Sequence, residues 1–234
     1  MHHGFTLYQG RDPRELPAYG ITEAARYVHI PPATLRSWVA GRTYPRQDGI
    51  GSFQPLIRAA GQEGVRLSFG NLVEAHVLRA LRTQHGVEIR AVRNALTYAE
   101  QELKIERLLL SNELLTDAGD IFLEYYGELL DLSRSGQIVM KKVLEAHLRR
   151  VERDDRDIPI RLYPFLPGEV GSDRRTVVID PFVSFGRPTV AGHGVTTAVL
   201  VGRVDAGESI EDLSDDYDIP QQEIEEAILF ERAA

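Results

Sequence analysis

The sequence predicts an α+β protein that is mainly α-helical. Apolar residues recur at helical spacing through most of the chain, and the strand-like runs are short and separated by glycine-rich stretches. A hydrophobic content of 43% is normal for a globular protein with a real core. At 234 residues the chain can form one large domain or two to three small ones.

Composition narrows the classes of protein further. No window approaches the roughly 20 unbroken apolar residues that a membrane helix needs, and the first residues lack the apolar core of a signal peptide. The chain has no cysteine, which excludes disulfides, thiolate zinc sites and thiol nucleophiles. We therefore expect a soluble cytoplasmic protein without a membrane partner.

Charge divides the chain into two unlike halves. Residues 1–115 carry 14 Lys and Arg against 11 Asp and Glu, a net charge of +3, and residues 116–234 carry 13 against 24, a net charge of −11. An acidic protein repels phosphates and is a poor general nucleic-acid binder. Specific DNA binding by the front half alone remains compatible with this balance, and the back half should then do something else.

Breaks in composition suggest five segments. Prolines and glycines interrupt any pattern in the lead-in, and the stretch PGEVGSDRR is the clearest linker. The expected boundaries are a lead-in at 1–20, a DNA-binding domain at 21–115, a small α/β layer at 116–166, a linker at 167–175 and a C-terminal domain at 176–234.

Residues 21–45 form the pattern around which the chain is organised, namely two short helices joined by a tight turn. Thr22 is expected to cap the first helix, and small residues on its inner face would allow close crossing. Pro32 suits the first position of the second helix, whose apolar stripe leaves polar and basic side chains outside. The inner residues are Ala24, Ala25 and Val28 in the first helix and Leu35, Trp38 and Val39 in the second.

The residues around Glu23–Ala25 and Thr34–Trp38 resemble the MerR-type winged helix-turn-helix, in which the second helix enters the DNA major groove. The resemblance implies that Thr34, Arg36 and Trp38 contact DNA, with Arg36 on a phosphate and Ser37 on the same outward face. The alternative is an ordinary helical hairpin in which Arg36 is merely solvated.

A wing is expected after the second helix. Two apolar runs at residues 53–57 and 65–69, separated by AAGQEG, predict a β-hairpin. Four arginines near it could bind phosphates, which position a protein on DNA without reading bases, although each could equally serve solubility. They are Arg42, Arg46, Arg58 and Arg66.

The next segments predict helices and then a small α/β layer. Asn71 and Glu74 read as a capping box that opens a helix ending at His85 and Gly86, and a further helix follows from about Glu88. A short helix is expected at 106–115. The layer should hold a tight hairpin of residues 121–126 and 128–132 joined at Gly127, a helix at 137–150 and an edge strand at 158–165.

The final segment predicts a strand at 176–179 and helices at 197–206, 209–216 and 221–232, with Ser209, Asp212 and Pro220 marking helix starts. Residues 178–181, 185–197 and 206–217 resemble the signature of domain of unknown function 433, although His193 stands where that family more often has threonine. Its shape resembles a helix-turn-helix. From Val177 onward, however, 3 Arg face 12 acidic residues, which favours a protein-facing surface over a DNA reader. We expect Ile224, Ala227, Ile228 and Phe230 to be core or dimer-interface residues.

The chain carries no pattern of an enzyme. It has no glycine-rich phosphate loop after a strand, no H-E-x-x-H and no G-x-S-x-G, and its seven histidines show no ligand spacing. One carboxylate cluster could attract a divalent ion, but its helical pattern favours a solvated surface. This cluster is Asp212, Asp215, Asp216 and Asp218. We expect no catalytic residue, metal or cofactor.

The combination of a MerR-like reader with this C-terminal domain resembles the VapB-type antitoxins of type II toxin–antitoxin pairs. The resemblance implies a homodimer that binds its own operator DNA and neutralises a toxin, most often a VapC ribonuclease of the PIN-domain class. Since that active site is a carboxylate cluster, arginines after residue 116 are the candidates for toxin binding. They are Arg134, Arg161, Arg174, Arg175 and Arg187. The alternatives are a ligand-responsive MerR-like regulator, with an effector site in the 116–165 layer, and an interaction module that does not bind DNA.

Overall fold

The computed structural model confirms a mainly α-helical fold with small two-stranded sheets. It describes residues 8, 10–46, 49–61, 66–82, 89–169 and 172–233. By its internal contacts the chain divides into two compact units: Met1–Leu72 together with Ile160–Ala234, and Val73–Pro159. This division differs from the boundaries expected from composition, because the N-terminal and C-terminal segments fold into one unit.

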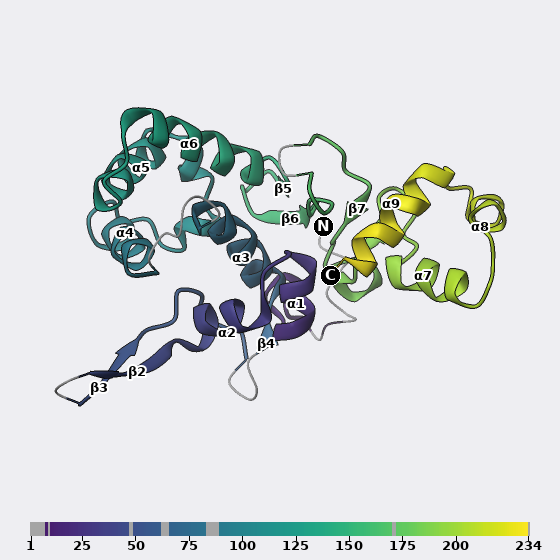
Figure 1. Ribbon diagram of the computed structural model, residues 1–234, viewed down its shortest axis with the longest axis horizontal. Coiled ribbons are helices and arrows are strands. Elements are labelled where there is room, and N and C mark those ends of the chain that lie inside the picture. The colour runs from purple at the N-terminus through teal and green to yellow at the C-terminus, as the bar shows by residue number, and fades with distance from the viewer. Residues whose placement is uncertain are drawn as a thin grey trace. The chain divides into compact units, whose positions relative to one another are not determined.

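The first unit begins with the helix-turn-helix and its strands (Figure 1). Strand β1 pairs antiparallel with β4, and β2 pairs antiparallel with β3. The elements are the 3-10 turn Pro13–Glu15, β1 (Tyr19–Gly20), α1 (Ile21–Tyr27), α2 (Pro32–Ala40), β2 (Arg42–Arg46), β3 (Gly49–Phe53) and β4 (Arg66–Leu67).

The predicted wing hairpin of residues 53–57 with 65–69 is wrong. The hairpin that forms is β2 with β3, which spans residues 42–46 and 49–53 and so lies earlier in the chain. Pro55 lacks an N–H for a strand ladder, and the N–H groups of Leu56 and Ile57 instead donate to the Trp38 carbonyl at 2.7 and 3.1 Å. This run therefore closes the end of α2, while β4 pairs with the distant β1.

The C-terminal part of the first unit matches its prediction closely. Helix α9 has the predicted bounds, and α8 starts with the predicted capping box, in which the Asp212 N–H donates to Ser209 Oγ at 3.1 Å. The predicted strand is shorter than expected. The elements are β7 (Val177–Val178), the 3-10 turn Ser184–Gly186, β8 (Thr189–Val190), α7 (Thr197–Asp205), α8 (Ile210–Tyr217) and α9 (Gln221–Arg232).

The second unit is built from helices, and α3 (Phe69–Arg82) enters it from the first. Its other elements are α4 (Ile89–Gln101), 3-10 turns at Leu108–Leu110 and Asn112–Leu115, α5 (Asp117–Leu129), α6 (Arg134–Leu148) and β5 (Val151–Arg153). Strand β6 (Pro159–Leu162) lies where the two units meet in sequence. None of the described helices is long and apolar enough to cross a membrane.

The predicted hairpin at residues 121–132 is wrong, because this stretch lies in α5 and the turn after it. Its β-branched and aromatic residues favour a strand locally. Phe122 and Tyr126 nevertheless lie four residues apart on one buried helical face, and the Tyr126 hydroxyl donates to the Leu81 carbonyl at 3.0 Å. Gly127 belongs to the helix rather than to a turn, and an added Cβ there would lie 2.7 Å from the Gln137 side chain.

Two helix starts also differ from prediction. Helix α1 begins after Gly20, whose N–H donates to Glu23 Oε2 at 3.3 Å, so Thr22 does not cap it. Helix α3 begins after Ser68, whose Oγ accepts the Asn71 N–H at 3.2 Å. Ser68 is therefore the N-cap residue, and Asn71 is its partner three residues later in the capping box. Glu74 does not take part in this box and pairs with Arg107 at 3.0 Å. The predicted helix end at His85 and Gly86 lies outside the described residues.

Candidate nucleic-acid interface

The core of the helix-turn-helix is closely packed. Ala24 and Ala25 of α1 are fully buried, as is Leu35 of α2, and Trp38 is 2% exposed. Because alanine places only a methyl group between two helices, α1 and α2 can approach closely at this crossing. The residues predicted to form the inner face do so.

The turn between the helices is fixed by backbone chemistry. His29 takes a left-handed conformation with φ of 51°, and the Ile30 N–H donates to the Ala25 carbonyl at 2.8 Å. Pro31 then caps α2 and Pro32 opens it, where the missing N–H costs nothing. At the far end Gly41, with φ of 72°, terminates the helix.

The outer face of α2 is polar and carries one cation. Arg36 is exposed, and within the described part of the chain its guanidinium has no hydrogen bond or ion pair. Thr34 and Ser37 are half-buried beside it, and the Ser37 hydroxyl donates to the Thr34 carbonyl at 2.8 Å. The assignment of Trp38 as a DNA contact is wrong, because its ring belongs to the core.

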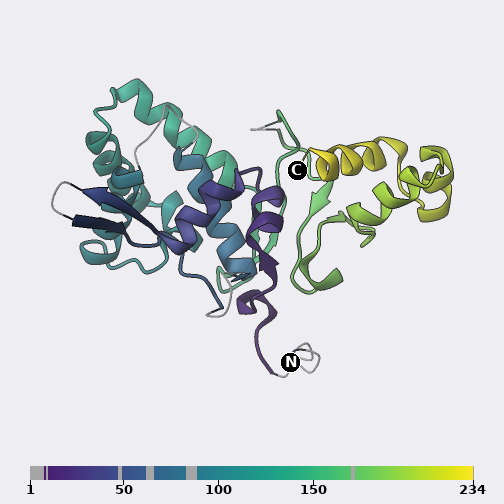
Figure 2. The same cartoon turned by 60° about the horizontal axis from the view of Figure 1, so that its bottom comes forward.

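The structure describes the side chains of only two of the four arginines predicted near the wing. Arg42 and Arg46 lie in β2, which with β3 extends away from α2 in Figures 1 and 2, and their side chains lie outside what the structure describes. Arg58 and Arg66 are exposed. Among the candidate DNA-binding arginines, the structure therefore describes the side chains of Arg36, Arg58 and Arg66, and all three are exposed.

Asn71 organises the loop that carries Arg58, a role that the sequence analysis missed. Its side chain is buried, its Nδ2 donates to the Arg58 carbonyl at 2.8 Å, and its Oδ1 accepts the Ala60 N–H at 3.1 Å. The available signal was the Ser68-x-x-Asn71 spacing of a capping box, whereas the predicted box pairs Asn71 with Glu74. Asn71 thus fixes the backbone from which Arg58 projects.

The other side of α1 is tied to the C-terminal segment of the same unit. Arg26 pairs with Glu231 at 2.7 Å, and the His29 ring meets the Phe230 ring edge-on at 5.5 Å. His29 Nε2 also lies 2.9 Å from the Phe165 carbonyl. The C-terminal end of α9 lies beside α1 in Figures 1 and 2. Arg26 is therefore engaged within the chain.

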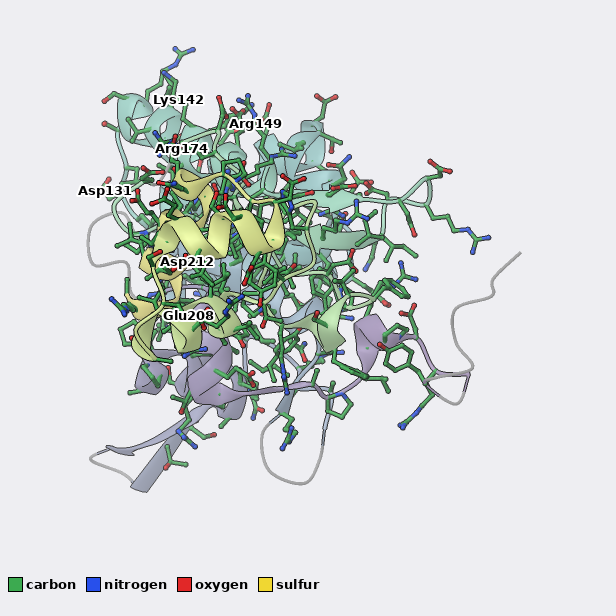
Figure 3. The ribbon with its side chains drawn as sticks, turned by 90° about the vertical axis from the view of Figure 1, so that its right-hand side faces the viewer. Asp131, Lys142, Arg149, Arg174, Glu208 and Asp212 are labelled. Atoms are coloured by element: carbon green, nitrogen blue, oxygen red, sulfur yellow. The ribbon has the colours of Figure 1, made fainter. Side chains whose placement is uncertain are left out.

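The outward surface of α8 and α9 is acidic. Glu225 is exposed and Glu223 half-exposed, whereas Glu226 is 8% exposed and accepts hydrogen bonds from Arg174, at 2.5 Å, and from Gln222 and Thr176. Figure 3 labels Arg174 beside α9, and Glu208 and Asp212 on the segment from α7 to α8. A surface of this sign repels phosphates.

Most of the arginines expected to bind a toxin have partners within the chain. Arg161 Nε donates to Asp180 at 2.8 Å, Arg174 pairs with Glu226, and Arg175 lies 4.9 Å above the Tyr163 ring. Arg134 is exposed at the start of α6 in the second unit. Arg187 is exposed in the loop between β7 and β8.

The described residues hold no group of three or more side chains suited to a metal ion. In the acidic cluster of α8, Asp212 accepts hydrogen bonds from Ser209, which lower its pKa below the ordinary value. Asp216 pairs with Arg203 at 2.5 Å. These carboxylates are engaged in holding the ends of α7 and α8.

Fold and surface together define a helix-turn-helix protein with an acidic, helical C-terminal domain. Two family models match these parts: "Putative DNA-binding HTH domain" over residues 17–96 and "Protein of unknown function (DUF433)" over residues 177–230. The second match agrees with the resemblance found in the sequence.

Relatives match nearly the whole chain. It is 30% identical over 232 residues to "Putative antitoxin VapB45" of Mycobacterium tuberculosis, covering 92% of this chain and 93% of that protein, and it belongs to the same family. It is 25% identical over 217 residues to the uncharacterized protein Rv2308 of the same organism, covering 90% and 88%. The crystal structure of Rv2018 from Mycobacterium tuberculosis matches with a TM-score of 0.66 at 25% identity, over 91% of this chain and 97% of that one.

Proposed function

We propose that this chain is the antitoxin of a type II toxin–antitoxin pair, which binds its own operator DNA and neutralises a toxin, a VapC-like ribonuclease of the PIN-domain class. The observation that carries the DNA-binding half is the outer face of α2, where Arg36 projects from a helix whose inner face is sealed by Leu35 and Trp38. The match to a DNA-binding helix-turn-helix model and the name of the relative VapB45 support it.

Charge favours the N-terminal segment as the side that meets DNA. Residues 1–72 carry 8 Arg against 5 acidic residues, whereas residues 177–234 carry 3 Arg against 12. Since affinity for DNA depends on cations placed against phosphates, the first segment attracts a duplex and the second repels it. Thr34 and Ser37 would then lie at base edges or phosphates, with Arg36, Arg58 and Arg66 on the backbone.

A homodimer on a palindromic operator completes the DNA-binding proposal. One helix of nine residues offers few base contacts, and paired readers on half-sites one helical turn apart supply the specificity that one reader lacks. Light scattering that gives a monomer, or a footprint on one unrepeated half-site, would argue against it.

Two assays test the function and separate it from its alternatives. In an electrophoretic mobility shift, the full chain should retard the DNA upstream of its own gene, whereas an interaction module should not. In a pull-down, the full chain should retain the co-expressed product of the adjoining reading frame. A ligand-responsive regulator would shift the DNA but retain no such product.

The Arg36→Ala variant tests the reading helix. If Arg36 contacts a phosphate, its loss weakens binding to operator and unrelated DNA alike and lowers the slope of log K against log salt by about one unit for each bound copy. Titrations at several salt concentrations measure that slope. Arg187→Ala is the matched control, because it removes an exposed arginine from the acidic segment. An unchanged slope in Arg36→Ala would remove Arg36 from the interface.

A further inference from the structure

The loop at residues 182–187 presents apolar side chains to solvent. Phe182 is 45% exposed, Val183 36% and Phe185 67%, although Tyr8 packs edge-on against Phe185 at 6.5 Å. Three large apolar side chains within four residues form an unusual surface for a domain whose helices expose carboxylates. Contiguous patches of this kind mark interaction sites more often than isolated apolar residues do.

The backbone of this 182–187 loop is held in a costly conformation. Ser184 and Phe185 both have left-handed backbones, with φ of 49° and 56°, and Gly186 follows with φ of 76°. A non-glycine residue in this region is sterically strained, and such strain concentrates at functional sites. Of these two strained residues, Phe185 also has the most exposed aromatic side chain of the patch.

Neighbouring residues fix the loop from both ends. Asp180 is 6% exposed, and its Oδ1 accepts the Phe182 N–H at 2.8 Å. At the other end the buried Tyr19 hydroxyl donates to the Gly186 carbonyl at 3.0 Å, and a Cβ at Gly186 would lie 2.2 Å from that hydroxyl. The loop is therefore preorganised, which lowers the entropic cost of ordering it when a partner binds.

The charges around the loop indicate what it binds. Arg187 is the one Arg, Lys, Asp or Glu between positions 181 and 195, while residues 177–234 carry 12 acidic residues. The segment that carries the loop is therefore acidic overall, and a net negative charge disfavours nucleic acids and anionic lipids as partners. A second copy docking through the same loop would bring the two Arg187 side chains together. The best match is a protein with an apolar cleft edged by carboxylates, which would pair with Arg187 as the loop is buried.

We propose that the 182–187 loop is the segment that docks the toxin, with Phe185 inserted into an apolar cleft of the toxin and Arg187 paired with carboxylates at the edge of that cleft. This assignment rests on the proposed antitoxin function and selects one arginine from the candidates. Arg187 is exposed and directly follows the apolar patch, whereas Arg161 and Arg174 are paired with Asp180 and Glu226. Arg175 lies over the Tyr163 ring, and Arg134, although exposed, belongs to α6 in the second unit.

The test uses the full chain and the tagged product of the adjoining reading frame, with affinity measured by calorimetry. Phe185→Ser should weaken binding by roughly 30-fold or more, as truncation of a central aromatic anchor does. Arg187→Glu should weaken it by at least about tenfold. Leu229→Ser is the matched control: Leu229 is 50% exposed on α9, and its loss should change affinity less than about twofold.

Three further readouts decide between outcomes. Hydrogen exchange in the wild-type complex should show new protection at residues 181–187, and operator affinity should be unchanged in each loop variant. If Phe185→Ser binds the toxin with wild-type affinity and Leu229→Ser loses binding, the 182–187 loop is not the docking segment. The proposed antitoxin function would still stand. No binding by the wild-type chain would overturn the proposed function and the loop with it. A change from dimer to monomer in Phe185→Ser would reassign the loop to contact between copies and overturn the proposal.

Discussion

Two helix pairs of the first unit, α1–α2 and α8–α9, are built on one plan. In each, a left-handed residue is followed by a buried isoleucine and a proline that caps the second helix, at positions 29–31 and 218–220. The left-handed φ values are 51° and 52°, and the proline ψ values are 132° and 135°. In both turns the isoleucine N–H donates to a carbonyl five residues earlier.

The buried positions of the second helices also correspond. Counting from the capping proline, the fourth, seventh and eighth residues face the core in both. They are Leu35, Trp38 and Val39 in α2, and Ile224, Ala227 and Ile228 in α9. The sequence left open whether the α9 residues serve a core or a dimer interface, and their burial assigns them to the core.

The exposed positions differ in charge. Five residues after the proline stands Arg36 in α2 and Glu225 in α9, and both are exposed. One position later, α2 has Ser37 and α9 has Glu226, which is held by Arg174. A shared backbone and core thus set the shape of the pair, and under the proposed function a few solvent-facing residues decide whether it can approach DNA.

The largest effect should come from the shared core. Leu35→Ala and Ile224→Ala remove fully buried side chains from corresponding positions. Each should lower the free energy of unfolding by roughly 2 to 5 kcal/mol, because lost burial and a residual cavity both contribute. Trp38 is the single tryptophan and is buried in this unit, so its fluorescence during urea titration reports the transition.

Leu229→Ala is the control for the core pair, since this α9 side chain is half exposed and its truncation should cost well under about 1 kcal/mol. If Leu35→Ala is costly and Ile224→Ala is not, the two helix pairs do not share one kind of core, and the comparison fails.

The next largest effect should come from reversing the charge at corresponding exposed positions of α2 and α9, which should change operator affinity in α2 only. Arg36→Glu gives α2 the charge of α9 and should weaken operator binding by about tenfold at each half-site, roughly 100-fold for a dimer. Glu225→Arg gives α9 the cation of α2, yet should change operator affinity by less than about twofold, because the remaining acidic residues still repel phosphates. Mobility-shift titrations at fixed salt measure both. A gain of DNA binding in Glu225→Arg would show that the charge at this one position accounts for the difference between the α1–α2 and α8–α9 pairs.

Local signals explain which elements were predictable. Helix α9 and the start of α8 follow from a proline, a Ser–Asp capping box and regular apolar spacing, all within a few residues. Arg36 was found as the exposed cation for the same reason, since the helical period places it opposite Leu35 and Trp38. Trp38 shows the limit of a motif: matching by position named it a DNA contact, whereas its place in the apolar stripe correctly predicted burial.

Long-range contacts explain what was missed. Strand β4 forms against β1, whose residues lie far earlier in the chain, and α5 is a helix because Phe122 and Tyr126 pack inward and Tyr126 bonds to Leu81. No local pattern at residues 121–132 encodes those partners, so intrinsic propensity favoured strands. Asn71 was likewise misjudged, because its partners at Arg58 and Ala60 belong to a loop with no regular spacing.

The smallest expected effect tests the left-handed residues on which both turns depend. Glycine adopts this conformation without the steric cost borne by other residues, so Asp218→Gly should raise the free energy of unfolding by about 0.5 to 1 kcal/mol. His29→Gly relieves the same backbone but also removes the contacts of its ring with Phe165 and Phe230. It should therefore lower stability by about 1 kcal/mol. Urea midpoints followed by Trp38 fluorescence compare the two variants. Opposite signs would show that the turns share a backbone but not a role, since His29 also fastens the helix-turn-helix to the C-terminal segment; equal stabilisation would mean that its ring contributes nothing there.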